Sequence, residues 1–106
     1  MPYALLYHPE VREEDIPPLP RNVQRRIARA LEARLATAPE QYGEPLRGTL
    51  RGYWKLRVGD YRVVFKVVGI EVWIFGIRHR KQIYEDVVRR LRQPVSESPE
   101  VPGADA

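Results

Sequence analysis

The chain of 106 residues contains no cysteine and only two histidines. Without cysteine it can form neither a disulfide framework nor a thiolate metal site, and two well-separated histidines are too few for a histidine-rich metal site. No segment approaches the roughly 18 to 20 apolar residues of a membrane span, and the amino terminus lacks the basic segment, apolar stretch and cleavage site of a signal peptide. These absences predict a cytoplasmic protein without a bound metal.

Acidic residues are the minority among the charged side chains. The chain has 18 Lys and Arg against 14 Asp and Glu, and three of those acids but no base lie in residues 93–106, which leaves 18 bases against 11 acids in residues 1–92. Residues 93–106 are rich in Pro, Ser and Glu with almost nothing to bury, which predicts a disordered acidic tail. Residues 1–92 are predicted to form one basic domain, whose partner could be nucleic acid, an anionic membrane surface or an acidic protein.

Three strands in succession are predicted between Gly52 and Tyr84. Residues 53–58 alternate in the manner of a half-buried strand, and the glycine-aspartate pair at 59–60 is a two-residue hairpin signal before a second β-rich run at 61–68. This register gathers four cations on one face: Lys55, Arg57, Arg62 and Lys66. Because like charges opposite each other destabilise a strand pair, we expect an anion to neutralise them.

The third strand, residues 71–78, has two possible registers. A two-residue turn at 69–70 would bury Arg78, whereas a three-residue loop at 68–70 would turn Arg78 to the basic face and send Trp73, Phe75 and Ile77 to the core. The second register is preferred because it avoids burying an arginine. It also places Gly76 on the basic face, where a ligand backbone could approach closely.

Apolar periodicity predicts a strand at 3–7, a short helix at 10–16, a helix at 21–38 and a final helix at 80–92. The short helix is expected to leave its acids in solvent, namely Glu13, Glu14 and Asp15. The outward arginines of the second helix are interpreted as a solvated surface, with contacts to phosphate as the less favoured alternative. The fold class is therefore α+β, with two layers. An antiparallel sheet, made of one N-terminal strand and a three-strand meander, packs with two N-terminal helices and a C-terminal helix.

The segment LRGYWKLRVGDYRVVFKV, followed by a strand that ends in IRHRKQIY and a closing helix, resembles the RelE/ParE superfamily of type II toxins, and within it the RelE branch. The resemblance covers residues 1–92 and implies an α/β sandwich whose first strand lies beside the last. It also implies a metal-independent endoribonuclease, an mRNA interferase that cleaves messenger RNA in the A site of the 30S ribosomal subunit and inhibits translation. A cognate antitoxin would wrap the toxin, and no cofactor is implied.

RNA cleavage without a metal needs a group that activates the 2′-hydroxyl, a grip on the phosphate and a proton for the leaving oxygen. Neighbouring cations disfavour the charged form of Lys55, which makes it a candidate base, and the guanidinium groups of Arg62 and Arg78 can hold phosphate. Resemblance to RelE implies the catalytic residues Lys55, Arg62, Arg78 and Tyr84. Further candidates for RNA binding are Tyr53, Arg57, Lys66, His79, Arg80 and Lys81, and Arg80 is expected to share a helical face with Tyr84.

Two departures and two alternatives accompany this interpretation. RelE-type sites can carry a second lysine where this chain has Tyr53, and some relatives use a glutamate and a histidine, for which His79 is a candidate. One alternative is a ParE-like module that poisons DNA gyrase, and the other is a member that binds RNA or antitoxin without cleavage. The HRKQIY segment and the helix after it favour the RelE branch. Taken singly, each cation could also be an ordinary solvent-facing residue of a strand.

Overall fold

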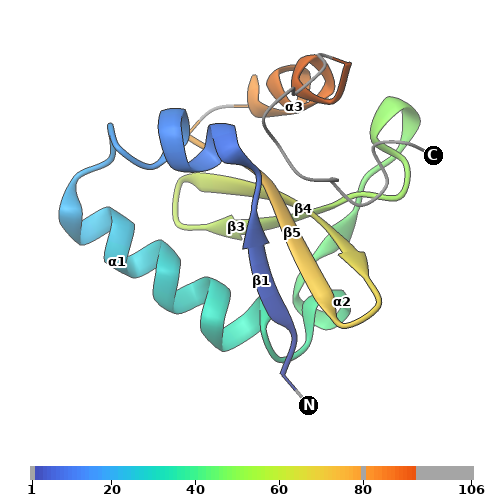
Figure 1. Cartoon of the computed structure of the whole chain (residues 1–106), viewed down its shortest axis with the longest axis horizontal. Helices are drawn as coiled ribbons and strands as arrows, with labels where there is room; N and C mark the ends of the chain where they lie inside the picture. The colour runs from blue at the N-terminus through green and yellow to red at the C-terminus, as the bar shows by residue number, and fades with distance from the viewer. Residues whose placement is uncertain (1, 80, 93–106) are drawn as a thin grey trace.

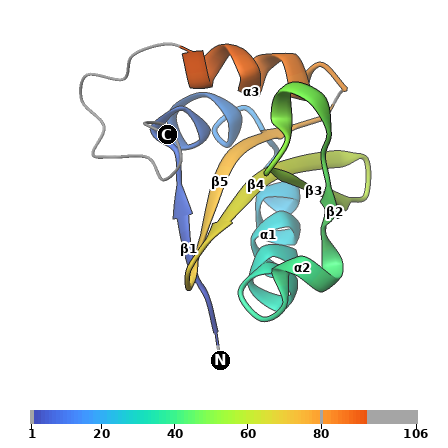
Figure 2. The ribbon, with the colours of Figure 1, turned by 90° about the vertical axis from the view of Figure 1, so that its right-hand side faces the viewer.

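The structure is a computed structural model that describes residues 2–79 and 81–92. Its centre is a five-stranded sheet with helices on both faces, as Figures 1 and 2 show. In chain order the elements are β1 (Ala4–Tyr7), η1 (Val11–Asp15), α1 (Arg21–Ala30), η2 (Leu31–Leu35), α2 (Pro39–Tyr42), β2 (Glu44–Pro45), η3 (Gly48–Leu50), β3 (Trp54–Val58), β4 (Tyr61–Val68), β5 (Glu71–Arg78) and α3 (Ile83–Arg92). Elements η1 and η2 are π-helical, and η3 is a 3-10 turn.

The strand order is β1-β5-β4-β3-β2, with β1 parallel to β5 and the other neighbours antiparallel. This arrangement confirms the α+β class and the position of the first strand beside the last, but the sheet is mixed and not antiparallel throughout, because β1 runs parallel to β5. The short strand β2 was not expected, and it adds a fifth member to the sheet. In the part of the chain that the structure describes, no helix has the length and apolar character needed to cross a bilayer.

The β3–β4 hairpin has the register that the sequence predicts. Val58 pairs with Tyr61 and Arg57 with Arg62 across the turn. Gly59 opens that turn with a φ of 60°, a left-handed conformation that glycine adopts without a steric penalty. The cationic side chains of the hairpin therefore share one face of the sheet.

The turn between β4 and β5 differs from the prediction. Val68 pairs directly with Glu71, so the connection has two residues and not three. As a consequence, Trp73 lies opposite Lys66 and packs on the α3 side of the sheet, not against α1. The prediction of a three-residue loop was wrong.

A β-bulge in β5 then reverses the parity. The pairing steps from Val64 opposite Gly76 to Phe65 opposite Ile74, which leaves Phe75 as the additional residue of the bulged strand. Arg78 is thereby returned to the face that was predicted for it, directly opposite Arg62. Phe75 itself points with Trp73 toward α3 and not toward α1.

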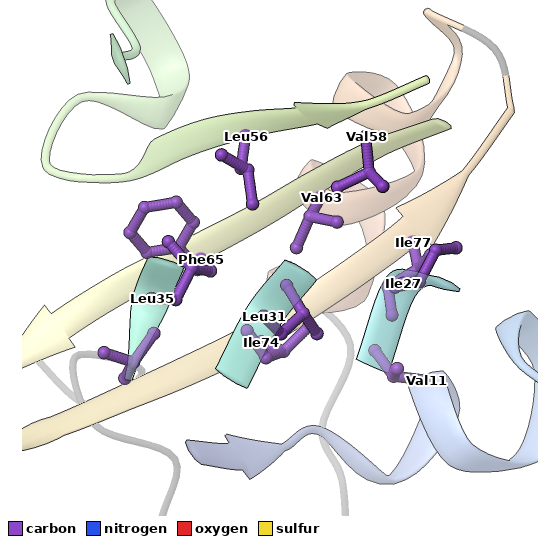
Figure 3. Packing of buried hydrophobic residues seen from close by; sticks show 11 residues of the cluster. Val11, Ile27, Leu31, Leu35, Leu56, Val58, Val63, Phe65, Ile74 and Ile77 are labelled. Carbon is purple, nitrogen blue, oxygen red and sulfur yellow. The ribbon is translucent and has the colours of Figure 1, made fainter. Parts of the chain in front are cut away.

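One apolar cluster joins the sheet to the helical layer formed by η1, α1 and η2 (Figure 3). The four-residue spacing of Ile27, Leu31 and Leu35 aligns these side chains on one face of the continuous helix, and all three are buried. Their partners are Val11 from η1 and, from the strands, Leu56, Val58, Val63, Phe65, Val72, Ile74 and Ile77. Each fully buried side chain of this size contributes about 1.5 to 3 kcal/mol, so this cluster fixes the helix to the sheet.

A second cluster covers the opposite face under α3 and η3, with Leu50, Tyr53, Val64, Phe75, Ile83 and Val87 as its buried members. Gly76 lies under α3. A Cβ at this position would stand 2.8 Å from Cγ2 of Val87 and 3.1 Å from Cδ1 of Ile83. Because Gly76 has no side chain, α3 can pack closely against it. The prediction that a ligand backbone approaches Gly76 was therefore wrong.

Asp15 was expected in solvent, and the structure instead buries its side chain completely. The backbone N–H of Ile77 donates to Oδ2 at 2.9 Å, and Nη1 of Arg90 donates to the same oxygen at 2.7 Å. Nη2 of Arg90 donates to Oδ1 at 2.5 Å. Val11 and Asp15 are four residues apart in η1, so both point at the sheet while the acids between them remain exposed.

Arg90 completes this ionic network from α3, and its side chain is only 4% exposed. Its Nη1 also donates to the carbonyl of Phe75 at 3.0 Å, and its Nε lies 3.1 Å from Oε1 of Glu10. Burial lowers the pKa of Arg90, but the hydrogen bonds and charge of Asp15, with Glu10 and Glu14, outweigh burial and raise it. The charged pair therefore ties η1, β5 and α3 together.

Replacement of Asp15 by asparagine is expected to lower the free energy of unfolding by about 3 kcal/mol, because the buried guanidinium group of Arg90 loses the carboxylate that binds it most closely. Urea unfolding of the wild type and the variant measures this loss. Glu13→Gln makes the same chemical change at an exposed position of η1 and should stay within about 0.5 kcal/mol of the wild type. Equal stability of the two variants would contradict the structural role of Asp15.

His8 predicts a pH dependence of stability. Its side chain is buried, and its Nδ1 accepts a hydrogen bond from the backbone N–H of Glu10 at 3.1 Å. Burial lowers the pKa of His8 and Arg90 adds to the effect, while Glu10 and Asp15 oppose it. Because the unfolded chain binds this proton more readily, stability should fall as the pH drops below about 6.5. The free energy of unfolding, measured at several pH values, should fall more steeply toward low pH for the wild type than for His8→Gln. The control variant His79→Gln, at an exposed histidine, should follow the wild type.

Candidate functional site

Three arginines stand in register across three neighbouring strands. Arg57 of β3 pairs with Arg62 of β4, and Arg62 pairs on its other side with Arg78 of β5. Since adjacent strands lie about 4.8 Å apart, this arginine row spans about 10 Å. Like charges directly opposite one another destabilise a strand pair, so the row requires anions nearby.

Among the described residues, carboxylates contact the arginine row at its Arg78 end. Nε of Arg78 donates to Oδ1 of Asp15 at 2.8 Å, and its Nη1 lies 3.9 Å from Oδ2 of Asp86. The side chain of Arg78 stays 39% exposed, but it does not line the open cleft at the other end of the row. Arg78 was expected to stand free beside Lys55 and Arg62, and the buried carboxylate holds it instead.

The other end of the arginine row faces an open cleft with a volume of about 710 Å³, which is within the range of ligand-binding pockets. Its walls come from β3 and β4, from the α2–β2 connection, from η2 and from the start of α3. Five cations line it: Arg34, Lys55, Arg57, Arg62 and Lys81. The other lining residues are Tyr42, Glu44, Leu56 and Tyr84. The excess of positive charge makes the cleft an attractive site for phosphate groups.

Glu44 gives the cleft a carboxylate next to Lys55. The two residues pair across β2 and β3, and Nζ of Lys55 lies 3.5 Å from Oε1 of Glu44. Both side chains are well exposed, at 39% and 72%, so the ion pair contributes less than about 1 kcal/mol. An incoming phosphate can therefore replace Glu44 as the partner of Lys55 at little cost.

Arg62 occupies the centre of the arginine row and reaches the cleft. Its Nη1 donates weakly to the carbonyl of His79, at 3.4 Å. The His79 ring lies edge-on to Tyr61, with 5.2 Å between ring centroids, and does not line the cleft. Within the described residues, this one weak bond leaves most donors of the Arg62 fork available for an anion.

Tyr53 and Lys66 lie apart from the cleft and contact each other. Tyr53 is 7% exposed and packs edge-on against Phe75, and Nζ of Lys66 lies 5.0 Å from the centre of its ring. Burial raises the pKa of Tyr53. The expectation that Tyr53 contacts RNA is therefore corrected, because its ring belongs to the second core cluster, and Lys66 makes a cation–π contact with it.

The start of α3 brings Tyr84 and Lys81 to the cleft. The backbone N–H of Tyr84 donates to the carbonyl of Lys81 at 3.1 Å, which closes the turn that leads into the helix. The helix begins at Ile83, later than the predicted residue 80. Arg80 lies outside the described residues, so its shared face with Tyr84 stays a prediction.

Arg34 was expected on a solvated helix surface, with a contact to phosphate as the less favoured alternative, and Tyr42 and Glu44 were not expected at the site. The three residues come from η2, α2 and β2, and no local motif marks them, although Arg34 belongs to the polar face of a helix whose periodicity is plain. The two-residue strand β2 pairs only with Trp54 and Lys55, which lets the cleft extend around the edge of β3 to Arg34. Within the described residues, no three His, Asp or Glu side chains converge on a position that could hold a metal ion.

Comparison with known proteins identifies the fold. A family model described as the ParE toxin of the type II toxin-antitoxin system parDE matches residues 3–84. The RelBE2 toxin-antitoxin complex of Mycobacterium tuberculosis is similar at 27% identity and a TM-score of 0.71, with 76% of this chain and 93% of that chain covered. A comparison with curated protein sequences finds no significant match.

Two structures of the E. coli toxin RelE are similar in fold. A double-arginine mutant in the free state has 22% identity and a TM-score of 0.65, with 85% of this chain and 98% of that chain covered. The isolated toxin has 20% identity and a TM-score of 0.59, with 84% and 98% covered. The family match runs from the residue before β1 to the first turn of α3 and so includes the whole sheet. The chain belongs to the ParE toxin family of type II toxin-antitoxin systems, within the RelE/ParE superfamily.

Proposed function

We propose that this toxin is an endoribonuclease that cleaves messenger RNA at the ribosomal A site and so inhibits translation. The observation that carries the proposal is the cleft, which five cations and Tyr84 line on a surface open to solvent. A scissile phosphodiester is an anion that lies between sugars carrying aromatic bases. Cationic donors can bind its phosphate, and a neighbouring aromatic ring can stack on a base. The toxin RelE shares the fold of this chain.

Arg62 is the residue best placed to hold the phosphate, because its guanidinium group faces the cleft from the centre of the arginine row. Arg57 adds a second guanidinium from the neighbouring strand. Such fixed donors stabilise the negative charge that develops on the phosphate oxygens in the transition state. Arg78 is bound by Asp15 at the far end of the row, so we assign the phosphate to Arg62 and Arg57.

Lys55 and Glu44 are the groups proposed to transfer protons, beginning with the proton of the attacking 2′-hydroxyl. The Glu44 carboxylate can accept that proton, and the ammonium of Lys55, whose Nζ lies 3.5 Å away in the same wall of the cleft, can protonate the leaving oxygen. Tyr84 would stack on a base or hydrogen-bond the 2′-hydroxyl. Lys81, at the mouth, would hold a neighbouring phosphate.

A cognate antitoxin is the protein partner of a toxin in this family. We propose that it covers the cleft with an acidic or amphipathic segment, since opposite charge would both guide its association and occupy the cations. RNA and antitoxin would then compete for the same donors. Their binding should weaken together as the salt concentration rises.

A second candidate function is supported by the family match itself, which names the ParE toxin. A ParE-like protein that poisons DNA gyrase would use the fold as a binding module and would not need the cleft for chemistry. The two candidates differ in a direct assay. Only the first gives strand breaks in ribosome-bound mRNA, and only the second blocks supercoiling by purified gyrase.

Arg62→Ala is expected to reduce the rate of mRNA cleavage on ribosomes by about 100-fold or more, which is the usual effect of removing one preorganised donor. The reduction should appear in kcat, measured by primer extension on a defined message. Urea unfolding should show a stability within about 0.5 kcal/mol of the wild type, because the lost hydrogen bond to His79 is long and exposed.

Arg21→Ala is the matched control, because Arg21 is an exposed arginine at the start of α1 that does not line the cleft. It should cleave at the wild-type rate. Unchanged cleavage in Arg62→Ala would contradict the assignment of the phosphate site. A wild-type protein that leaves mRNA intact but inhibits gyrase would favour the second candidate.

A further inference from the structure

Tyr42 is an aromatic residue at the cleft that the catalytic proposal leaves without a role. It is the last residue of α2, it lines the cleft, and it is 52% exposed. A single exposed aromatic side chain is common on protein surfaces and needs no special explanation. Its position beside cations, and the way its backbone is held, distinguish Tyr42 from such residues.

The backbone on both sides of Tyr42 is firmly anchored. Pro39 is buried, and its carbonyl accepts a hydrogen bond from the N–H of Gly43 at 2.9 Å. Gly43 lies so close to Phe65 that a Cβ added there would stand 2.5 Å from Cζ of that ring. The N–H of Tyr42 itself donates to the carbonyl of Ala38 at 3.2 Å. An exposed ring on an anchored backbone loses little entropy when it binds a flat ligand.

The residues around Tyr42 indicate which kind of flat ligand its ring would bind. Tyr42 and Tyr84 come from different walls of the cleft, and Lys55 and Arg62 line it with them. An acidic peptide would use the cations but would not need a second aromatic surface. A single-stranded polynucleotide has an anionic backbone and flat bases in regular alternation, and proteins bind it with this combination of cations and aromatic rings.

We propose that Tyr42 stacks on a base of single-stranded RNA next to the phosphodiester held by Arg62, a role that rests on the proposed RNA-cleaving function. Tyr84 then takes the base or sugar on the other side of that phosphodiester. Every base has a face that can stack, so Tyr42 accepts any nucleotide but prefers the larger purines. Tyr42 is thus a residue that positions the substrate and sets a modest base preference.

The test uses the full chain and a short single-stranded RNA whose 2′-hydroxyls are methylated, so that it binds without being cleaved. Fluorescence anisotropy at low salt measures its Kd for the wild type, Tyr42→Ala and Tyr42→Phe. The alanine variant should bind about tenfold more weakly, in line with the loss of one stacked base, and the phenylalanine variant should bind like the wild type. Ile70→Ala, at a 70% exposed residue of the β4–β5 turn outside the cleft, is the control and should have no effect.

A series of RNAs that each lack one base distinguishes stacking from a general effect on the cleft. At one position, loss of the base should weaken binding to the wild type about tenfold and should have almost no further effect on Tyr42→Ala, because both changes remove the same contact. A weaker binding of Tyr42→Ala that is equal for all of these RNAs would overturn the inference. Wild-type affinity of Tyr42→Ala, or no RNA binding by the wild type at low salt, would overturn it as well.

The inference and the proposed function can fail separately. If ribosome-bound mRNA is cleaved equally well by the wild type and Tyr42→Ala, with equal RNA affinity, the stacking role is wrong while the activity stands. If the base-removal series shows shared loss at one position but no mRNA is cleaved, the stacking role stands and the nuclease assignment is wrong. A loss of antitoxin affinity alone would assign Tyr42 to the protein partner and overturn the inference.

Discussion

A buried carboxylate holds the charged surface of this protein in place. Asp15 accepts hydrogen bonds from Arg90, from Arg78 and from the backbone of Ile77, and so it joins η1 to α3 and to β5. A charge without partners inside a protein costs several kcal/mol, so these groups must stay together for the fold to persist. The first turn of α3 is thereby kept where its side chains reach the cleft.

The same network resolves a conflict built into the sheet. The arginine row places like charges opposite one another on three strands, an arrangement that is unfavourable in a strand pair. Asp15 and Asp86 neutralise the Arg78 end, whereas the Arg57 and Arg62 end faces the cleft with Glu44 as its one lining carboxylate among the described residues. The positive charge of the row is therefore neutralised within the protein at the Arg78 end, and at the Arg57 and Arg62 end it is open to an anion from outside.

The tyrosines divide between core and surface in a way that their sequence positions do not reveal. Tyr53 lies directly before Trp54, the first residue of β3, yet residues of η3 and α3 enclose its ring. Tyr42 ends the four-residue helix α2, where no apolar pattern marks it, yet it reaches the same cleft as Tyr84. Family membership accounts for the sheet and its topology, whereas the positions of these two tyrosines follow from how η3, α2 and α3 pack around the sheet.

The sequence by itself determined the elements whose cause is local. Alternation and a glycine turn specify the β3–β4 register, and a four-residue apolar spacing specifies the buried face of α1 and η2. These patterns placed Lys55, Arg57 and Arg62 together, and the resemblance added Tyr84. The tertiary structure alone decided the burial of Asp15, the bulge at Phe75 and the arrival of Arg34, Tyr42 and Glu44 at the cleft. Asp15 meets Arg90 across 75 residues of chain, and a contact of that range depends on how whole layers pack, which no local pattern encodes.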